Sequence, residues 1–287
     1  MTNVAKQIII SIMEDSLNHM KDNIDKAVSI GARAIEARCD QMYEFKSPGV
    51  YSPPLKGLMR HLVSRGHGNI TQVITFRSST QAGGFGGFSL PGAYADDAPQ
   101  VEQHRKGYVS HALNFARELK GHFIIDFELG EAERIPLVEL PVKTLLSYHN
   151  NLETPENLVN IYARLKNSKA NIIKLVTRAK DYGDSLEMLR VVQEHQESKN
   201  PKELIAFCTG SYGSITRVLS PLVGAAYTLA CLGNKQTANG QLDFSTTALA
   251  MRAARGMGFD NPIKMDVDEL ADAAKRLNVD AYTLGQN

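Results

Sequence analysis

The sequence has little of what marks several common classes of protein. Its 32 basic residues are balanced by 31 acidic ones, so the charge gives no reason to expect a nucleic-acid partner or an anionic membrane. The apolar run near the N-terminus is interrupted at Glu14 and Asp15, which makes it too short for a signal peptide or a membrane span. We therefore expect neither a nucleic acid nor a membrane among its partners.

Cysteines and metal-binding spacings are also scarce. The three cysteines, Cys39, Cys208 and Cys231, are odd in number and lie in apolar runs. This usage predicts reduced thiols and a cytoplasmic location, with Cys208 an inert packed thiol rather than a nucleophile. The sequence contains no CxxC or HExxH spacing, so no metal site is expected.

What the sequence does contain is a long alternation of strand and helix patterns. Eight strands alternating with helices over about 250 residues predict a (β/α)8 TIM barrel, with a doubly wound open sheet as the alternative. We expect a single catalytic barrel domain over residues 1–258 and an extra C-terminal helical segment over 259–287. The strands are expected at 7–13, 34–40, 70–77, 122–129, 144–149, 171–176, 203–208 and 226–232.

Polar side chains recur on one alternate face of several expected strands, which favours the barrel. Helices cover both faces of an open parallel sheet, so both of its faces are apolar. The inner face of a barrel instead collects catalytic groups near the carboxyl ends of its strands. The residues in question are Glu36, Arg38 and Asp40 on the second strand, Thr75 and Arg77 on the third, and Asp126 and Glu128 on the fourth.

Side chains at the starts of helices and the scattered histidines complete the expected layout. Asp15 and Asp184 are expected to cap helices, Thr154 to open one, and Asp266 with Glu269 to form a capping box. The histidines expected at the surface are His61, His67, His104, His111, His122 and His195.

The stretch from Thr144 to Val176 contains the strongest chemical signal. It predicts a strand that ends at His149, a helix, and a second strand with Lys174 at its centre. Strand side chains alternate between faces, so Ser147 and His149 share one face. The separation of 25 residues (174 − 149) is one strand-helix-strand unit, which predicts adjacent parallel strands.

Lys174 is flanked by Ile, Leu and Val residues. Burial disfavours the ammonium form, so we expect the pKa of this lysine to fall. A neutral amine near a histidine suits Schiff-base chemistry, in which the histidine moves protons. The ordinary alternative is a strand lysine that pairs with a carboxylate.

A set of motifs resembles the type I 3-dehydroquinate dehydratases. The motifs are GARAIEARCD, ITFR, IIDFEL, LLSYHN, NIIKLV, GSITR and NGQ, in this order over residues 7–255. The resemblance implies a barrel fold, no cofactor or metal, a homodimer, and a place in the shikimate pathway of aromatic amino acid biosynthesis. It also implies a hydro-lyase reaction in which 3-dehydroquinate loses water through a lysine Schiff base.

The resemblance also implies roles for individual residues. Lys174 is similar to the Schiff-base lysine and His149 to the general acid–base of the family. The residues that resemble substrate-binding positions are Glu36, Arg38 and Arg77, together with Arg217 for a carboxylate and Thr237 and Gln241 in a closing loop.

Some segments depart from the family pattern or allow another interpretation. Gln81 stands where the family has a glutamate, and the 237–241 loop reads Thr-Ala-Asn-Gly-Gln rather than Ser-Ala-Pro-Gly-Gln. The glycine-rich 81–98 segment is a candidate lid. The 207–214 segment could hold a phosphate, which would suit a Schiff-base aldolase acting on a phosphorylated sugar. A barrel that has lost catalysis and serves binding is the remaining alternative.

Overall fold

The structure is a computed structural model that describes residues 4–42, 52–64, 70–78, 98–132, 140, 142–200, 202–258 and 265–277. The expected lid falls almost wholly outside these residues, as do His67 and the side chain of His104. The chain divides into two compact units. Unit 1 comprises Met1–Ile10 and Leu146–Asn287, and unit 2 comprises Ser11–Leu145. The expected boundary between residues 1–258 and 259–287 stays a prediction.

The described residues form eight strands in the sheet order β7-β6-β5-β4-β3-β2-β1-β8. Pairing is parallel between β2 and β3, β3 and β4, and β6 and β7. A parallel bridge joins Ile205 to Tyr227, so β7 also reaches the segment that leads into β8. The fold is a (β/α)8 barrel, as predicted. The strands are β1 (Ile8–Met13), β2 (Ala34–Arg38), β3 (Thr71–Thr75), β4 (Phe123–Glu128), β5 (Lys143–His149), β6 (Ile172–Arg178), β7 (Glu203–Thr209) and β8 (Thr228–Cys231).

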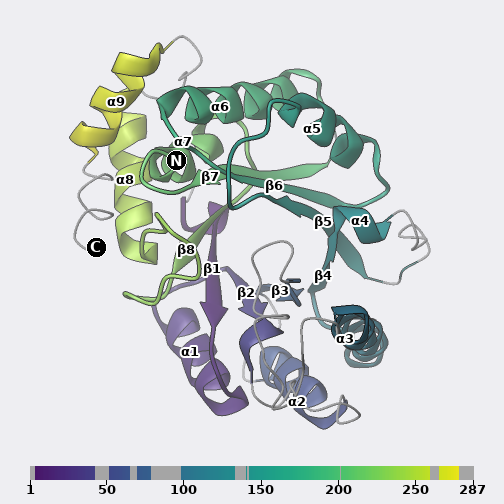
Figure 1. The fold of residues 1–287 in the computed structure, drawn as a ribbon. Coiled ribbons are helices and arrows are strands. Elements are labelled where there is room, and N and C mark those ends of the chain that lie inside the picture. The colour runs from purple at the N-terminus through teal and green to yellow at the C-terminus, as the bar shows by residue number, and fades with distance from the viewer. Residues whose placement is uncertain are drawn as a thin grey trace. The chain divides into compact units, whose positions relative to one another are not determined.

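Unit 2 holds α1 (Leu17–Ser29), α2 (Ser52–Val63), α3 (Ala98–Leu119), the short α4 (Leu129–Ala132) and a 3-10 turn at Cys39–Gln41. The N-cap of α1 is Ser16, whose side chain accepts from the His19 amide, so the expectation of Asp15 as the cap was wrong. Asp15 instead contacts the His19 ring. Helices α2 and α3 pack against each other in this unit (Figure 1).

Unit 1 holds α5 (Leu158–Asn167), α6 (Tyr182–Glu197), α7 (Ser214–Val223), α8 (Phe244–Gly256), α9 (Val267–Arg276) and a 3-10 turn at Val4–Gln7. Helices α5 and α6 run along β6 and β7, and α9 contacts α6 (Figure 1). The Asp266–Glu269 capping box of α9 is confirmed. The expectation that Thr154 opens a helix was wrong by three residues, because Asn157 precedes α5. The expectation that Asp184 caps a helix was also wrong by three residues, because Asp181 caps α6.

His195 is the clearest error among the expected surface histidines. It is 4% exposed on the inner side of α6. The Tyr162 hydroxyl lies 3.0 Å from its Nδ1, and its Nε2 lies 3.0 Å from the Lys202 carbonyl oxygen. A carbonyl oxygen only accepts, so Nε2 carries the proton and Nδ1 accepts from Tyr162. Burial lowers the pKa of His195, which keeps the ring neutral.

The three cysteines are free and buried, as predicted. Burial raises the pKa of Cys208 to about 12, so its thiol stays protonated near neutral pH and is a poor nucleophile. Burial raises the pKa of Cys231 to about 11. In the parts of the chain that the structure describes, no helix is long and apolar enough to cross a bilayer.

Candidate active site

Lys174 occupies the centre of β6 and is 3% exposed. It pairs in register with Ile205 of β7, and Val176 pairs with Phe207. Paired residues of parallel strands point to the same face, and side chains alternate along each strand. Lys174, Val176, Ile205 and Phe207 therefore share one face, so the neighbours of the lysine on that face of β6 and β7 are apolar side chains.

His149 is half-buried at the end of β5. The Asn150 amide donates to the Val176 carbonyl oxygen at 2.9 Å. In a parallel ladder this bond places His149 beside Val176, and counting back two residues on each strand places Ser147 beside Lys174. His149 and Lys174 thus share a face of neighbouring strands, with the histidine two residues nearer the carboxyl ends. This is the arrangement that the sequence predicted.

Arg217 lies at the end of the first turn of α7 and is 1% exposed. Its guanidinium carbon lies 4.2 Å from the centroid of the Phe207 ring, and its Nη1 donates to the Leu229 carbonyl oxygen at 3.3 Å. Since Phe207 is on the face of Lys174, the guanidinium lies close to that face too. The sequence pointed to Arg217 but not to its contact with Phe207.

The loop between β8 and α8 is held together by Gln241, which is 1% exposed. Its side-chain oxygen accepts from the Thr237 amide at 2.7 Å and from the Thr237 hydroxyl at 3.0 Å. The loop meets the β7–α7 turn at Gly240, where φ is +74°. A Cβ at Gly240 would lie 2.4 Å from Ser214 Oγ and 2.5 Å from the Gly210 carbonyl oxygen. The two sequence-predicted loop residues therefore bind each other in a loop that packs on this turn.

Backbone amides of the β7–α7 turn donate hydrogen bonds to carbonyl oxygens of the chain. Gly213 and Ser214 donate to the Gly210 carbonyl oxygen at 3.2 and 3.1 Å. The Gly210 amide donates to the Asn239 carbonyl oxygen at 3.2 Å. A phosphate nest needs several backbone amides directed at the anion, and these three are directed at carbonyl oxygens. Their arrangement therefore offers little support for the phosphate interpretation.

Unit 2 contains a buried network of carboxylates, hydroxyls and arginines on β1 to β4. Glu36 of β2 is 2% exposed, and its two oxygens accept from Ser11 Oγ at 2.6 Å and from Thr75 Oγ1 at 3.1 Å. Thr75 Oγ1 also lies 3.2 Å from Asp126 Oδ2. Thr75 thus lies between carboxylates on both neighbouring strands, which fixes the position of Glu36 on the inner face.

Arg77 follows β3 and is 2% exposed. Its Nη2 donates to Asp126, and its Nη1 lies 3.5 Å from Glu128 Oε1. Glu128 is itself held by Ser78, whose amide and hydroxyl donate to it at 2.8 and 2.6 Å. A planar guanidinium held by two carboxylates has a fixed orientation. Arg77 is therefore a rigid donor rather than a mobile surface arginine.

Arg38 ends β2 and binds Asp40, which is 1% exposed. Its Nε and Nη2 donate to the two Asp40 oxygens at 2.7 and 2.8 Å, a bidentate pair. Burial is the largest single influence and works against the charge of Arg38, but the charge and hydrogen bonds of Asp40, together with the charges of Glu36 and Asp126, outweigh it and raise the pKa of the guanidinium. Arg38 therefore stays charged at any pH at which the protein is folded.

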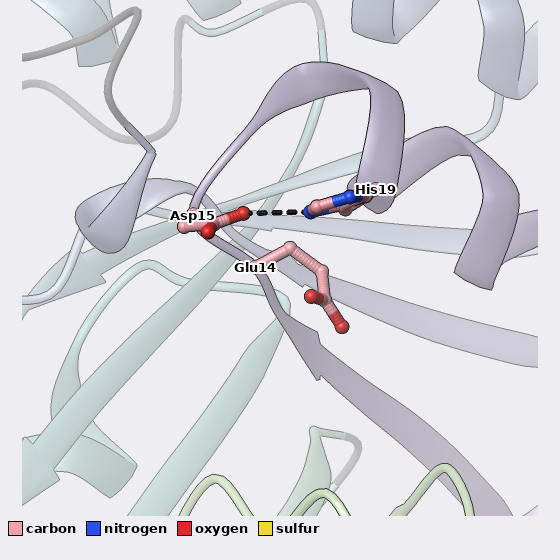
Figure 2. Close-up of side chains that lie close together, drawn as sticks. All are labelled: Glu14, Asp15 and His19. Atoms are coloured by element: carbon pink, nitrogen blue, oxygen red, sulfur yellow. Dashed lines mark hydrogen bonds and ion pairs between the residues drawn. The ribbon is translucent and has the colours of Figure 1, made fainter.

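A second cluster, which the sequence reasoning missed, lies where β1 leads into α1. Glu14, Asp15 and His19 each place a ligand-type atom within 4.8 Å of the others (Figure 2). His19 Nδ1 is 2.8 Å from Asp15 Oδ1, and Glu14 accepts a hydrogen bond from Asn23. Asp15 and His19 are largely exposed, so the cluster reads as a surface hydrogen bond between these two side chains beside a hydrogen-bonded carboxylate.

A family model described as Type I 3-dehydroquinase matches residues 8–255. The chain belongs to this family. The match covers every strand of the barrel and all eight predicted site residues, and it ends before α9.

Relatives within the family are moderately similar. A 3-dehydroquinate dehydratase of Dehalococcoides mccartyi (strain ATCC BAA-2266 / KCTC 15142 / 195) is 28% identical over 195 residues, which cover 65% of this chain and 76% of that protein. A 3-dehydroquinate dehydratase of Coxiella burnetii (strain RSA 493 / Nine Mile phase I) is 30% identical over 129 residues, which cover 44% of this chain and 54% of that protein. The second match thus spans about half of its relative.

Solved structures of the same family share the fold. The type I 3-dehydroquinate dehydratase of Clostridium difficile matches with a TM-score of 0.69 at 20% identity, covering 88% of this chain and 93% of that one. The 3-dehydroquinate dehydratase of Geobacillus kaustophilus matches with a TM-score of 0.66 at 21% identity, covering 88% and 91%. At these identities the likeness supports the barrel fold.

Ser11, Ser78 and Phe207 were not singled out from the sequence. Ser11 left a signal, because it is the one hydroxyl in the apolar run IIISIM. Phe207 left no signal, because a phenylalanine in an apolar strand is ordinary core and its contact with Arg217 depends on how α7 packs on β7.

Proposed function

We propose that this chain is a 3-dehydroquinate dehydratase of the type I family, which eliminates water from 3-dehydroquinate by a syn mechanism to give 3-dehydroshikimate. Lys174 forms the Schiff base, and His149 is the general acid and base. The observation that carries the proposal is Lys174 itself, a buried lysine at the centre of a barrel strand in a chain of this family.

The reaction begins with the Lys174 amine. Its lone pair attacks the ketone carbon of 3-dehydroquinate, and loss of water leaves an iminium ion. The positive nitrogen acts as an electron sink, so His149 can take the proton from the adjacent carbon and leave an enamine. The lysine supplies this electron sink by itself, and the proposed reaction steps therefore use neither a metal nor a cofactor.

The second half of the reaction returns the proton. The protonated His149 gives it to the departing hydroxyl on the same face of the ring, the carbon–oxygen bond breaks, and water leaves. Electrons of the enamine flow back to restore the iminium ion. Hydrolysis then releases 3-dehydroshikimate and regenerates the Lys174 amine. The net change is the loss of one water, and the position of His149 towards the carboxyl ends of the strands, on the face of Lys174, supports one group acting in both steps.

The remaining residues receive binding roles. Arg217 is assigned to the substrate carboxylate, because a guanidinium fork matches a carboxylate in shape and charge. Thr237 and Gln241 are assigned to a loop that closes over the substrate. Glu36, Arg38 and Arg77 are assigned to the hydroxyl-bearing part of the substrate, a role that suits rigidly held polar groups.

Assembly and location complete the proposal. A homodimer follows from the resemblance to the family, and a cytoplasmic location follows from three reduced cysteines in apolar surroundings. The aldolase alternative is disfavoured by the turn at 210–214, where the amides of Gly210, Gly213 and Ser214 donate to carbonyl oxygens of the chain.

The test is an assay of dehydratase turnover in matched lysine variants. Conversion of 3-dehydroquinate is followed by the absorbance of the conjugated enone product. The wild type is expected to turn over and Lys174→Met to lose the activity. Lys180→Met is the control, because Lys180 is 60% exposed in a surface pair with Glu153, and it should keep the wild-type rate. An inactive wild type would favour a barrel that serves binding only.

A further inference from the structure

We infer that Phe207 is a positioning residue that orients the Arg217 guanidinium towards the substrate carboxylate. The inference rests on the proposed function, since it gives a role to a neighbour of the proposed carboxylate-binding arginine. It adds a residue that the motifs did not contain and explains how a buried arginine is kept in place close to the face that carries the lysine.

The packing of the two side chains carries the inference. Phe207 is 2% exposed and Arg217 is 1% exposed, and the guanidinium carbon lies 4.2 Å from the ring centroid. At this distance the cation rests against the ring and is attracted by the negative face of its π-system. The ring therefore limits the movement of the guanidinium on that side.

The position of Arg217 in its helix explains why such support is needed. Arg217 is the fourth residue of α7, which begins at Ser214. The N-terminal end of a helix carries partial positive charge and does not favour a cation nearby. The Leu229 carbonyl oxygen accepts from Nη1 at 3.3 Å, a long hydrogen bond. The Phe207 ring therefore supplies a second, shape-defining contact for a cation that is buried in an unfavourable place.

The strand register ties this contact to the lysine. Lys174 pairs with Ile205 and Val176 pairs with Phe207, so Phe207 lies on the lysine's face and two residues nearer the strand ends. The ring thus sets the separation between the amine and the guanidinium. A substrate that presents a ketone to one and a carboxylate to the other would be selected by that separation.

The test compares two cyclic ketones with matched Phe207 variants. One ketone is 3-dehydroquinate, and the other is the same hydroxylated ring ketone without the carboxylate. For each variant, the concentration dependence of borohydride-trapped adduct on Lys174 is measured by mass spectrometry, and KM and kcat are measured with 3-dehydroquinate. If the wild type traps no adduct with 3-dehydroquinate, the proposed function fails before the role of Phe207 is at issue.

We expect Phe207→Leu to raise the KM and the half-saturating concentration for 3-dehydroquinate about tenfold, because one cation–π contact is lost. Trapping of the ketone without the carboxylate should be unchanged. Phe207→Met replaces the ring by a flexible, unbranched side chain that adapts to irregular gaps and carries the same expectation, so the test survives an unstable leucine variant. Phe207→Tyr keeps the ring and should restore discrimination between the two ketones.

Phe244→Leu is the control, because Phe244 is another buried phenylalanine of unit 1, at the start of α8. It should leave the preference for the carboxylated ketone intact. The inference is overturned if Phe207→Leu and Phe207→Met raise the half-saturating concentrations of both ketones equally, which would mark a general packing role. It is also overturned if both variants leave the half-saturating concentrations at the wild-type values.

Discussion

The Asn150 amide and the Val176 carbonyl oxygen, 2.9 Å apart, set the register of β5 against β6. This single bond places His149 on the face of Lys174 and two residues nearer the strand ends. The proton-transfer role proposed for His149 depends on that placement. If the bond set a register shifted by one residue, the histidine would point to the opposite face.

Replacing His149 by alanine should separate imine formation from turnover. The Lys174 amine is intact in this variant, so borohydride should still trap an adduct, while dehydratase turnover should fall at least about a hundredfold because the general acid–base is missing. Turnover is measured in steady state and the adduct by mass spectrometry. His122→Ala, an exposed histidine before β4, is the control. A His149→Ala variant with a nearly normal rate would refute the role.

The buried network of unit 2 predicts a stability effect at Thr75. Its hydroxyl lies within 3.1 Å of Glu36 and 3.2 Å of Asp126, and Thr75→Val would leave both buried carboxylates without it. We expect the free energy of unfolding in urea to fall by about 1–3 kcal/mol. Thr71→Val, at the half-buried start of the same strand, should stay within about 0.5 kcal/mol of the wild type. Equal effects at the two positions would argue against the network.

We expect alanine substitutions to differ in their effects on stability at two glycines with positive φ in the loop between β8 and α8. Gly240 has a φ of +74° and a Cβ there would meet Ser214 and Gly210, whereas Gly233 has a φ of +57° and nothing within 4 Å. Each alanine pays for a left-handed backbone, about 1–2 kcal/mol, but only Gly240→Ala must also displace the β7–α7 turn. It should therefore lose more stability in urea and raise KM, because the turn precedes Arg217. Equal losses in the two variants would contradict the close approach.

We expect protonation of His195 to cause part of the fall in the free energy of unfolding at acidic pH. Its folded-state pKa is lowered from 6.5 by burial, so the unfolded state binds the proton more readily. The stabilising contribution is fully present above pH 6.5 and is lost as the pH falls from there through the folded-state pKa. His195→Gln cannot titrate, so its unfolding free energy should fall less than that of the wild type between pH 7 and 5. His122→Gln, at an exposed site, should follow the wild-type curve; a His195→Gln curve parallel to the wild type would overturn the argument.

Much of the fold and the chemistry could be predicted because it depends on local patterns. The two-residue alternation of strands placed Lys174 and His149 on inner faces, and the strand-helix-strand spacing placed them on neighbouring strands. The burial of His195 could have been predicted from helix periodicity, since His195 follows Val192 by three residues on the buried stripe of α6.

The rest depends on contacts between elements distant in sequence. The stacking of Arg217 on Phe207 arises from how α7 packs on β7, and the docking of Gly240 on Gly210 joins two loops. Helix starts were misplaced because several residues near each start can cap. Asp181 rather than Asp184 caps α6, and both are aspartates with suitable side chains.

The most direct test of the account is to identify the lysine that bonds to the substrate. The protein is incubated with 3-dehydroquinate, reduced with borohydride, digested, and mapped by mass spectrometry. We expect one stoichiometric adduct, on Lys174, which is absent from Lys174→Met and unchanged in Lys180→Met. No adduct in the wild type, or an adduct on another lysine that persists in Lys174→Met, would contradict it.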